Sequence, residues 1–173
     1  GDMVPGPAVR GLEPDGHQIL HYASLAPSGH NSQPWFVKIK TAHEWVVGSD
    51  KNRWLPAVDS DNREVLLSIG AFVENLVQAA GALGYEATAR VLASGRFDDD
   101  MVNIRLKKGG VKKDILKQIV SRRTVKSHLR DTELTLKDVK DFSKLTDDHL
   151  YYFPRGSEHS DLMAKEAVDN FII

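Results

Sequence analysis

The most constraining feature of this sequence is a long apolar segment, Asp61 to Gly84, which predicts one continuous helix. Apolar residues occupy nearly every side of the segment, and a helix of that kind is buried on most of its faces. Glu74, Asn75 and Gln78 interrupt the apolar run too early for it to span a membrane. One thin layer could not cover such a helix on both sides, so we expect the rest of the chain to fold around it.

Alternating apolar and polar residues predict strands elsewhere, and helical spacing predicts further helices. The predicted strands are 36–40, 44–48, 86–93, 101–107 and 151–153, and the further helices are 16–26, 114–121 and 161–173. Asp15 is the expected cap of the first helix, and Asp61 with Glu64 has capping-box spacing at the long one. Together these elements predict an α+β fold, an antiparallel-rich sheet flanked by helices around a long central helix.

Composition excludes several classes of function. Basic and acidic residues number 23 and 24, so a net charge of -1 gives no general attraction to nucleic acid or to an anionic membrane. The absence of cysteine excludes disulfides, thiolate catalysis and cysteine-ligated metals. His17 and His21 are spaced for zinc, but no H-E-x-x-H pattern accompanies them, and we expect no metal. No secretory signal is visible and we expect a cytoplasmic protein, although a leader removed by processing would leave no trace.

The segment from Ala26 to Trp35 is the first candidate site. We call its residues Ser28–Pro34 the Ser28 loop; they carry Ser28, Asn31, Ser32 and Gln33, all uncharged hydrogen-bonding side chains. Donors and acceptors at fixed positions would suit a planar ligand with polar edges. The same composition also suits an ordinary turn after a helix, and taken alone it favours the turn.

A second candidate site is the run Arg122-Arg123-Thr124. Two guanidinium groups bind phosphate oxygens in a bidentate way, and a threonine hydroxyl adds a donor. The alternative is a surface pair that contacts the carbonyl end of a helix. Arg53 and Trp54 could also contact a ligand, but a loop tryptophan more often anchors its loop on the core.

Residues Ser28–Trp35, SGHNSQPW, resemble the S-x-x-N-x-Q-P-W motif of the FMN-dependent nitroreductase family. Residues Gly70–Gly84 are similar to that family's central helix, G-A-x-x-x-N-L-x-x-A-A-x-x-L-G. The resemblance implies that Ser28, Asn31, Ser32, Gln33 and Pro34 contact the flavin ring and ribityl chain. It also implies that the central helix forms a homodimer interface, or that of an internal pseudo-dimer.

Arg122, Arg123 and Thr124 resemble the family's R-R-S/T motif, which holds the flavin phosphate. In ordinary members this motif opens the chain, whereas here it follows the Ser28 loop. This order of the two motifs is similar to that in the branch of the family with two nitroreductase-like halves in one chain. We therefore expect an irregular arm at 1–14, a first half at 15–110 and the start of a second half at 111–173. The chain stops on an apolar run, 171–173, so we expect the second half to be truncated.

The resemblance implies an FMN-dependent oxidoreductase, with NADH or NADPH as electron donor and a nitroaromatic, quinone or similar small molecule as acceptor. No residue stands out as a catalytic acid or base. An alternative is a non-catalytic protein of the same fold that binds or sequesters flavin. A further alternative, an interaction domain without flavin, would place Arg122 and Arg123 far from the Ser28 loop.

Overall fold

The structure is a computed structural model that describes residues 12–109, 114–125, 127–128, 130, 132–145 and 150–169, with the backbone alone at 168 and 169. It consists of two compact units, and the division between them falls between Thr124 and Val125. Each unit is described separately below.

The first unit is built on a four-stranded antiparallel sheet in the order β1-β2-β4-β3. Its strands are β1 (Trp35–Thr41), β2 (Glu44–Ser49), β3 (Tyr85–Val91) and β4 (Asp100–Lys108). Four of the predicted strands are therefore present, with small differences at their ends. With the helices described next, they confirm the α+β class.

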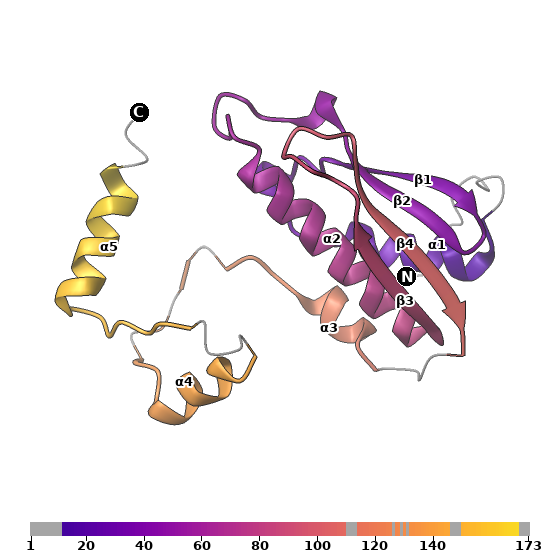
Figure 1. Ribbon diagram of the computed structural model, residues 1–173. Coiled ribbons are helices and arrows are strands. Elements are labelled where there is room, and N and C mark those ends of the chain that lie inside the picture. Colours follow the sequence, from indigo (N-terminus) through magenta and orange to yellow (C-terminus); the bar gives the residue numbers. More distant parts are fainter. Residues whose placement is uncertain are drawn as a thin grey trace. The chain divides into compact units, whose positions relative to one another are not determined.

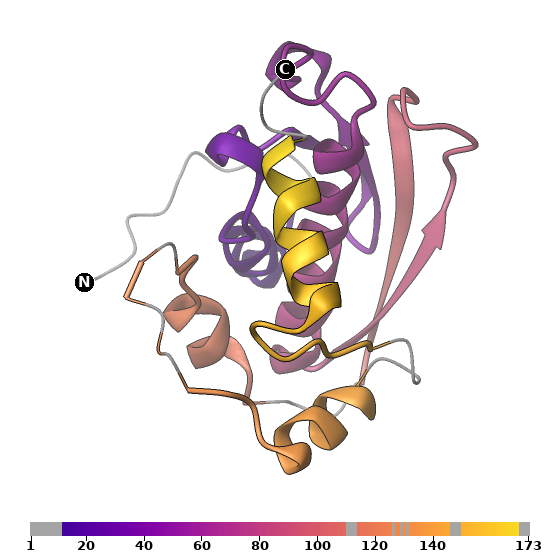
Figure 2. The same cartoon turned by 90° about the vertical axis from the view of Figure 1, so that its left-hand side faces the viewer.

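Two helices, α1 (Pro14–Ser24) and α2 (Arg63–Ala82), lie on the same side of this sheet (Figures 1 and 2). Helix α2 packs against α1 and against β3. Ile19 of α1, Leu76 of α2, and Trp45 and Ile104 of the sheet are almost completely buried between these elements. The long central helix predicted from the sequence therefore does organise the core.

The N-terminal end of α2 differs from the prediction. Asn62, not Asp61, is the capping residue, and it adopts a left-handed conformation with φ of 54° and no side-chain cap bond. The carboxylate of Asp59 instead accepts the N–H of Val65 at 3.0 Å. The capping box of Asp61 and Glu64 was therefore wrong, because a left-handed residue turns the chain just before the helix. Gly84, with φ of 86°, follows the helix as predicted.

Helix α2 is long and apolar enough to cross a membrane by length and composition alone. Its inward residues Leu76, Ala79 and Ala80 are nevertheless completely buried against the rest of the unit. Its outward residues include Leu67, which is 66% exposed, and Gly70, where an added Cβ would meet no atom within 4 Å. Helix α2 is thus the core helix of a folded unit, with one uncovered apolar side.

Helix α1 begins slightly earlier than predicted. Pro14 is its first residue and Asp15 lies in its first turn, so Asp15 is not the cap. Proline is favoured at this position because its missing N–H would have no partner inside the helix. A short helix, α3 (Leu116–Ser121), packs against α1 and α2 through Ile119, which is buried. Two 3₁₀ turns, η1 (Gly29–Asn31) and η2 (Lys51–Arg53), complete the unit.

The second unit contains α4 (Leu136–Ser143) and α5 (Glu158–Asp169). Thr135 and Asp138 form a capping box at the start of α4. Residues Tyr151–Phe153 form no strand, so that prediction was wrong, and Tyr152 instead donates a hydrogen bond to Glu133. The last helix begins earlier than predicted, and 170–173 lie outside the described residues. No described residue of this unit is buried.

Candidate functional site

The Ser28 loop joins α1 to β1 and is closed by its own serine. The hydroxyl of Ser28 accepts the backbone N–H of Gln33 at 3.0 Å. The Ser28 carbonyl accepts the N–H of Asn31 at 3.0 Å, and the Gly29 carbonyl accepts that of Ser32 at 2.9 Å. These bonds satisfy the backbone of a tight loop within the loop itself.

Three residues of the loop that are not glycine have left-handed backbones. The φ angles are 49° at His30, 56° at Asn31 and 50° at Gln33. Such a conformation costs about 1 to 2 kcal/mol per residue, although asparagine tolerates it better than most. Residues of this kind persist where their surroundings hold them, and they gather at ligand sites. The loop therefore stores local strain that an ordinary turn would not need.

Helix α2 holds the loop from one side. The N–H of Gly29 donates to the hydroxyl of Ser68 at 3.3 Å, and that hydroxyl donates to the carbonyl of Glu64 at 2.6 Å. A Cβ at position 29 would lie 2.3 Å from a carboxylate oxygen of Glu64. Glycine therefore allows the loop to approach the first turns of the central helix closely.

The side chains of the loop differ in what they do. Pro34 is fully buried, and the ring of Trp35 packs on that of Phe72 with centroids 4.9 Å apart. The side chains of Asn31 and Gln33 have no hydrogen-bond partner among the described residues, and Asn31 is exposed. The loop is thus anchored by its apolar end, while its amide groups remain available to a ligand.

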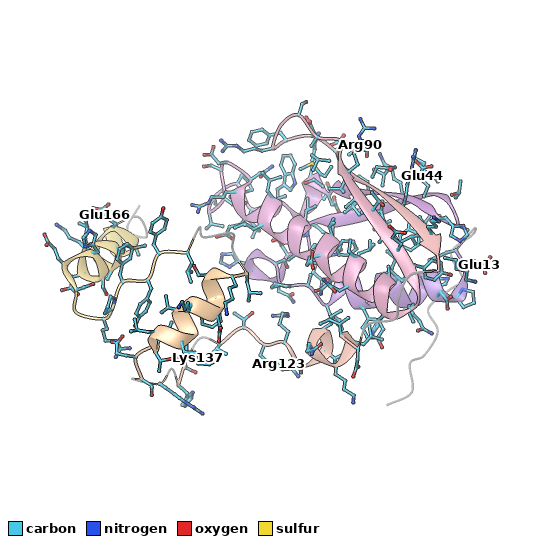
Figure 3. All side chains as sticks on the ribbon, turned by 60° about the horizontal axis from the view of Figure 1, so that its bottom comes forward. Glu13, Glu44, Arg90, Arg123, Lys137 and Glu166 are labelled. Atoms are coloured by element: carbon cyan, nitrogen blue, oxygen red, sulfur yellow. The ribbon has the colours of Figure 1, made fainter. Side chains whose placement is uncertain are left out.

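The structure brings Arg122 close to Leu25, which lies three residues before the Ser28 loop. Arg122 donates from Nη2 to the carbonyl of Leu25 at 3.2 Å and from Nη1 to the hydroxyl of Thr124 at 3.4 Å. Arg123, labelled in Figure 3 beyond α3, donates from Nη1 to the carbonyls of Val120 and Arg122, each at 2.8 Å. The remote arginine pair of the interaction-domain alternative stays a prediction, because Arg122 bonds to Leu25 and not to the Ser28 loop itself.

Neither arginine is neutralised by a carboxylate within the described part of the chain. Arg123 caps carbonyls at the end of α3, as the surface-pair alternative predicted. Arg122 and Arg123 nevertheless keep N–H groups that these bonds do not use, and each retains its full charge. Two unneutralised guanidinium groups can accept an anion such as a phosphate.

The loop of residues 50–62 contributes a contact that the sequence did not reveal. Arg53 donates from Nη1 to the carbonyl of Ser32 at 3.2 Å, and its Nε lies 3.3 Å from a carboxylate oxygen of Asp50. Trp54 donates from Nε1 to the hydroxyl of Ser49 at 2.7 Å and packs near Phe97, so it anchors this loop as expected. In the sequence, only the long, hydrogen-bond-donating side chain of Arg53 could have suggested this contact with the Ser28 loop.

Metal binding has no support in the described ranges, where no three His, Cys, Asp or Glu side chains gather into a potential site. His21 makes an edge-on ring contact with Tyr22, with centroids 5.4 Å apart. The polar groups near the Ser28 loop are amides and hydroxyls, and the arginine run adds two guanidinium groups.

No family model matches the chain. The chain is 40% identical over 67 residues to a Serratia protein named probable NAD(P)H nitroreductase PigM. It is 43% identical over 68 residues to acg of Mycobacterium tuberculosis, named as a putative NAD(P)H nitroreductase. Over these residues the chain is similar to proteins named as NAD(P)H nitroreductases. These alignments cover 38% and 39% of the chain but only 19% and 20% of the two relatives, so the chain matches about a fifth of their length.

Two solved structures have a slight likeness to this chain. One is a nitroreductase-like protein from Streptococcus mutans, with 17% identity, a TM-score of 0.46, and coverage of 68% of this chain and 90% of that one. The other is an NADPH:FMN oxidoreductase from Vibrio harveyi, with 14% identity, a TM-score of 0.44, and coverage of 96% and 86%. Scores this low assign no role to any residue of the site.

Proposed function

We propose that the chain forms part of an FMN-dependent oxidoreductase that takes electrons from NADH or NADPH and passes them to a small acceptor. A nitroaromatic compound or a quinone is the proposed class of acceptor. The names of the two sequence relatives support the donor, and the motifs of the Ser28 loop and the arginine run support the flavin. The proposal rests on one observation above all, the Arg122–Leu25 hydrogen bond, which joins the arginine run to the lead-in of the Ser28 loop.

The residues present fit the chemistry of FMN. An isoalloxazine ring offers both donors and acceptors at its edges, and the free amides of Asn31 and Gln33 supply both kinds of partner. Ser28, Ser32 and Pro34 would complete the contact with the ring and ribityl chain. Arg122, Arg123 and Thr124 would hold the phosphate, because guanidinium groups match phosphate oxygens. When bound, FMN would supply the redox chemistry, and the chain would supply binding and orientation.

A second copy of the chain is the proposed partner. The outward side of α2 presents Leu66 and Leu67, which are 37% and 66% exposed, around the open position of Gly70. Arg63 and Glu74 flank this groove with opposite charges. A two-fold related copy could therefore place apolar residues against apolar residues and Arg63 against Glu74. An internal pseudo-dimer, with a second half in place of the second copy, would use the same surface.

The direct test is a visible absorbance spectrum of the purified protein after incubation with FMN and desalting, beside an intact-mass determination. Retained flavin near one per chain or per dimer is the expected result. Anaerobic addition of NADH or NADPH would then bleach the flavin of an oxidoreductase, whereas a flavin-sequestering protein would keep its absorbance. Failure of the natural full-length chain to retain any flavin would contradict the proposal.

A further inference from the structure

The peptide group between Ser32 and Gln33 is hydrogen-bonded at both of its ends. Its N–H donates to the hydroxyl of Ser28 at 3.0 Å. Its carbonyl accepts from Nη1 of Arg53 at 3.2 Å. The plane of this peptide therefore cannot rotate without the loss of at least one of the two bonds. The bond from Arg53 joins residues that are farther apart in the sequence than the bond to Ser28 does.

The peptide group between Pro34 and Trp35, at the end of the same loop, is also held by the loop of residues 50–62. The carbonyl of Pro34 accepts the backbone N–H of Asp50 at 3.0 Å. Gln33 thus lies between two carbonyls, at positions 32 and 34, that both bind residues of one neighbouring segment. Its own φ of 50° is unfavourable for a residue with a side chain and needs such support.

Arg53 is itself held in place. Its Nε lies 3.3 Å from Oδ2 of Asp50, and Oδ1 of Asp50 accepts the N–H of Asn52 at 3.1 Å. Asp50 therefore fixes both the turn that carries Arg53 and the guanidinium group. Because the backbone turn and the guanidinium group of Arg53 are already fixed, its side chain loses less conformational entropy when it binds a carbonyl, and it can hold that carbonyl in place.

We propose that Arg53 is a positioning residue that holds the Ser32–Gln33 peptide and so presents the amide of Gln33 to the flavin ring. This inference rests on the proposed function, because it assigns Arg53 a role in FMN binding without direct contact with FMN. It extends the site to a residue that belongs to neither the Ser28 loop nor the arginine run. The guanidinium group of Arg53 acts through the backbone of the Ser28 loop.

The first test measures the brace without any ligand. Hydrogen exchange at the backbone N–H of Gln33, followed by NMR, is compared in the unsubstituted chain and in Arg53→Met. This substitution keeps the length of the side chain and removes its hydrogen-bond donors. Exchange is expected to be several-fold faster in Arg53→Met, because the peptide can rotate away from Ser28. Arg53→Lys restores one charged donor and should recover part of the protection. Unchanged exchange in Arg53→Met would overturn the inference.

Arg96→Met is the matched control. Arg96 is also about half exposed, with an ion pair to Asp61 at 3.0 Å and a donation to a backbone carbonyl at 3.4 Å. It braces the segment before α2 rather than the Ser28 loop, so exchange at Gln33 should stay as in the unsubstituted chain. A thermal unfolding midpoint for each variant separates a local change from a general loss of folding.

The second test is FMN binding, followed by quenching of flavin fluorescence and by the visible circular dichroism of the bound ring. Arg53→Met should bind FMN about tenfold more weakly, as for the loss of one charge-assisted hydrogen bond, and with an altered dichroism spectrum. Equal affinity and an equal spectrum in Arg53→Met would overturn the inference. If the natural full-length chain binds no FMN, the proposed function fails, while the exchange comparison still decides whether Arg53 holds the peptide.

Discussion

The guanidinium group of Arg122 donates a hydrogen bond to the carbonyl of Leu25 at 3.2 Å, although 97 positions separate the two residues in the sequence. The contact is possible because α3 packs on α1 and α2 through Ile119 and ends just before Arg122. Leu25 lies shortly before Ser28 in the chain. Two motifs that are distant in sequence are therefore parts of one compact unit, which is the arrangement that a shared ligand requires.

Charge reversal at Arg123 should weaken FMN binding. Arg123→Glu replaces an unneutralised guanidinium group with a carboxylate that repels phosphate, and we expect affinity to fall at least about tenfold. Folding should change little, since Arg123 is exposed and bonds only to carbonyls of its own turn. Fluorescence titration with FMN measures the effect. Lys117→Glu makes the same charge change on the exposed surface of α3 and is the control, and equal affinities in the two variants would refute the phosphate assignment.

Much of the sheet could be predicted because its residues alternate. Val37 and Ile39 pack against the core while Lys38 and Lys40 are exposed, as a half-buried strand requires. The same reasoning failed at Tyr151–Phe153, where aromatic residues suggested a strand but no described strand pairs with them. Strand propensity reflects packing against neighbours, so a short run without a partner is not informative.

The candidate site was only partly predictable. The motifs identified the Ser28 loop and the arginine run, but the left-handed backbone of Gln33 left no trace in residue type, unlike that of Asn31. Arg53 reaches the carbonyl of Ser32 across 21 positions, and only the folded chain brings them together. Contacts between a side chain and a distant backbone carbonyl leave no sequence pattern, because every residue carries the same carbonyl.

Substitution of two glycines should have opposite effects on stability. A Cβ at Gly48 would lie 2.2 Å from the ring of Phe36 and 2.4 Å from the backbone carbonyl of Asp99. Gly48→Ala should therefore lower the free energy of unfolding by about 1 to 3 kcal/mol, the usual cost of overpacking. Gly70 has open space around it inside α2, so Gly70→Ala should raise stability by about 0.5 to 1 kcal/mol. Urea unfolding of dilute protein measures both, and equal signs would contradict the packing described.

Tyr85 should make the chain sensitive to alkaline pH. Burial raises the pKa of the Tyr85 hydroxyl above its ordinary value, and the hydrogen bond to Asp15 at 3.0 Å raises it further. The folded state therefore favours the neutral hydroxyl of Tyr85. The contribution of this hydroxyl to the free energy of unfolding is complete below the unfolded pKa of about 10, and it is lost as pH rises through the higher folded pKa. Tyr85→Phe lacks this contribution at every pH.

Urea unfolding of the unsubstituted chain and of Tyr85→Phe measures the difference. Near pH 8 the unsubstituted chain should be more stable by about 1 kcal/mol, the usual value of one hydrogen bond. The difference in the free energy of unfolding should shrink above about pH 10. There Tyr85 of the unsubstituted chain ionises more readily in the unfolded state than in the folded state, which favours unfolding, and Tyr85→Phe has no such group. The other tyrosines ionise in both proteins and cancel. A difference that stays constant with pH would show that Tyr85 ionises as in the unfolded chain.

The uncovered side of α2 should mediate self-association. Leu67 is 66% exposed at the middle of the groove formed with Leu66 and Gly70, so a charge there would face any partner without disturbing the core. Leu67→Glu is expected to weaken dimer formation at least about tenfold, because a carboxylate buried in an apolar interface lacks a partner. Light scattering after size-exclusion chromatography over a range of concentrations measures the change.

Leu92→Glu provides the matched comparison for this surface. Leu92 is 46% exposed and lies beside Arg90 and Glu44. Figure 3 labels Arg90 and Glu44 on the sheet face that points away from α2. Leu92 receives the same substitution on a face without the apolar groove, and its association should equal that of the unsubstituted chain. Equal weakening by both variants would indicate a general effect of charge rather than an interface on α2. A chain that stays monomeric at every concentration would exclude a dimer through this surface.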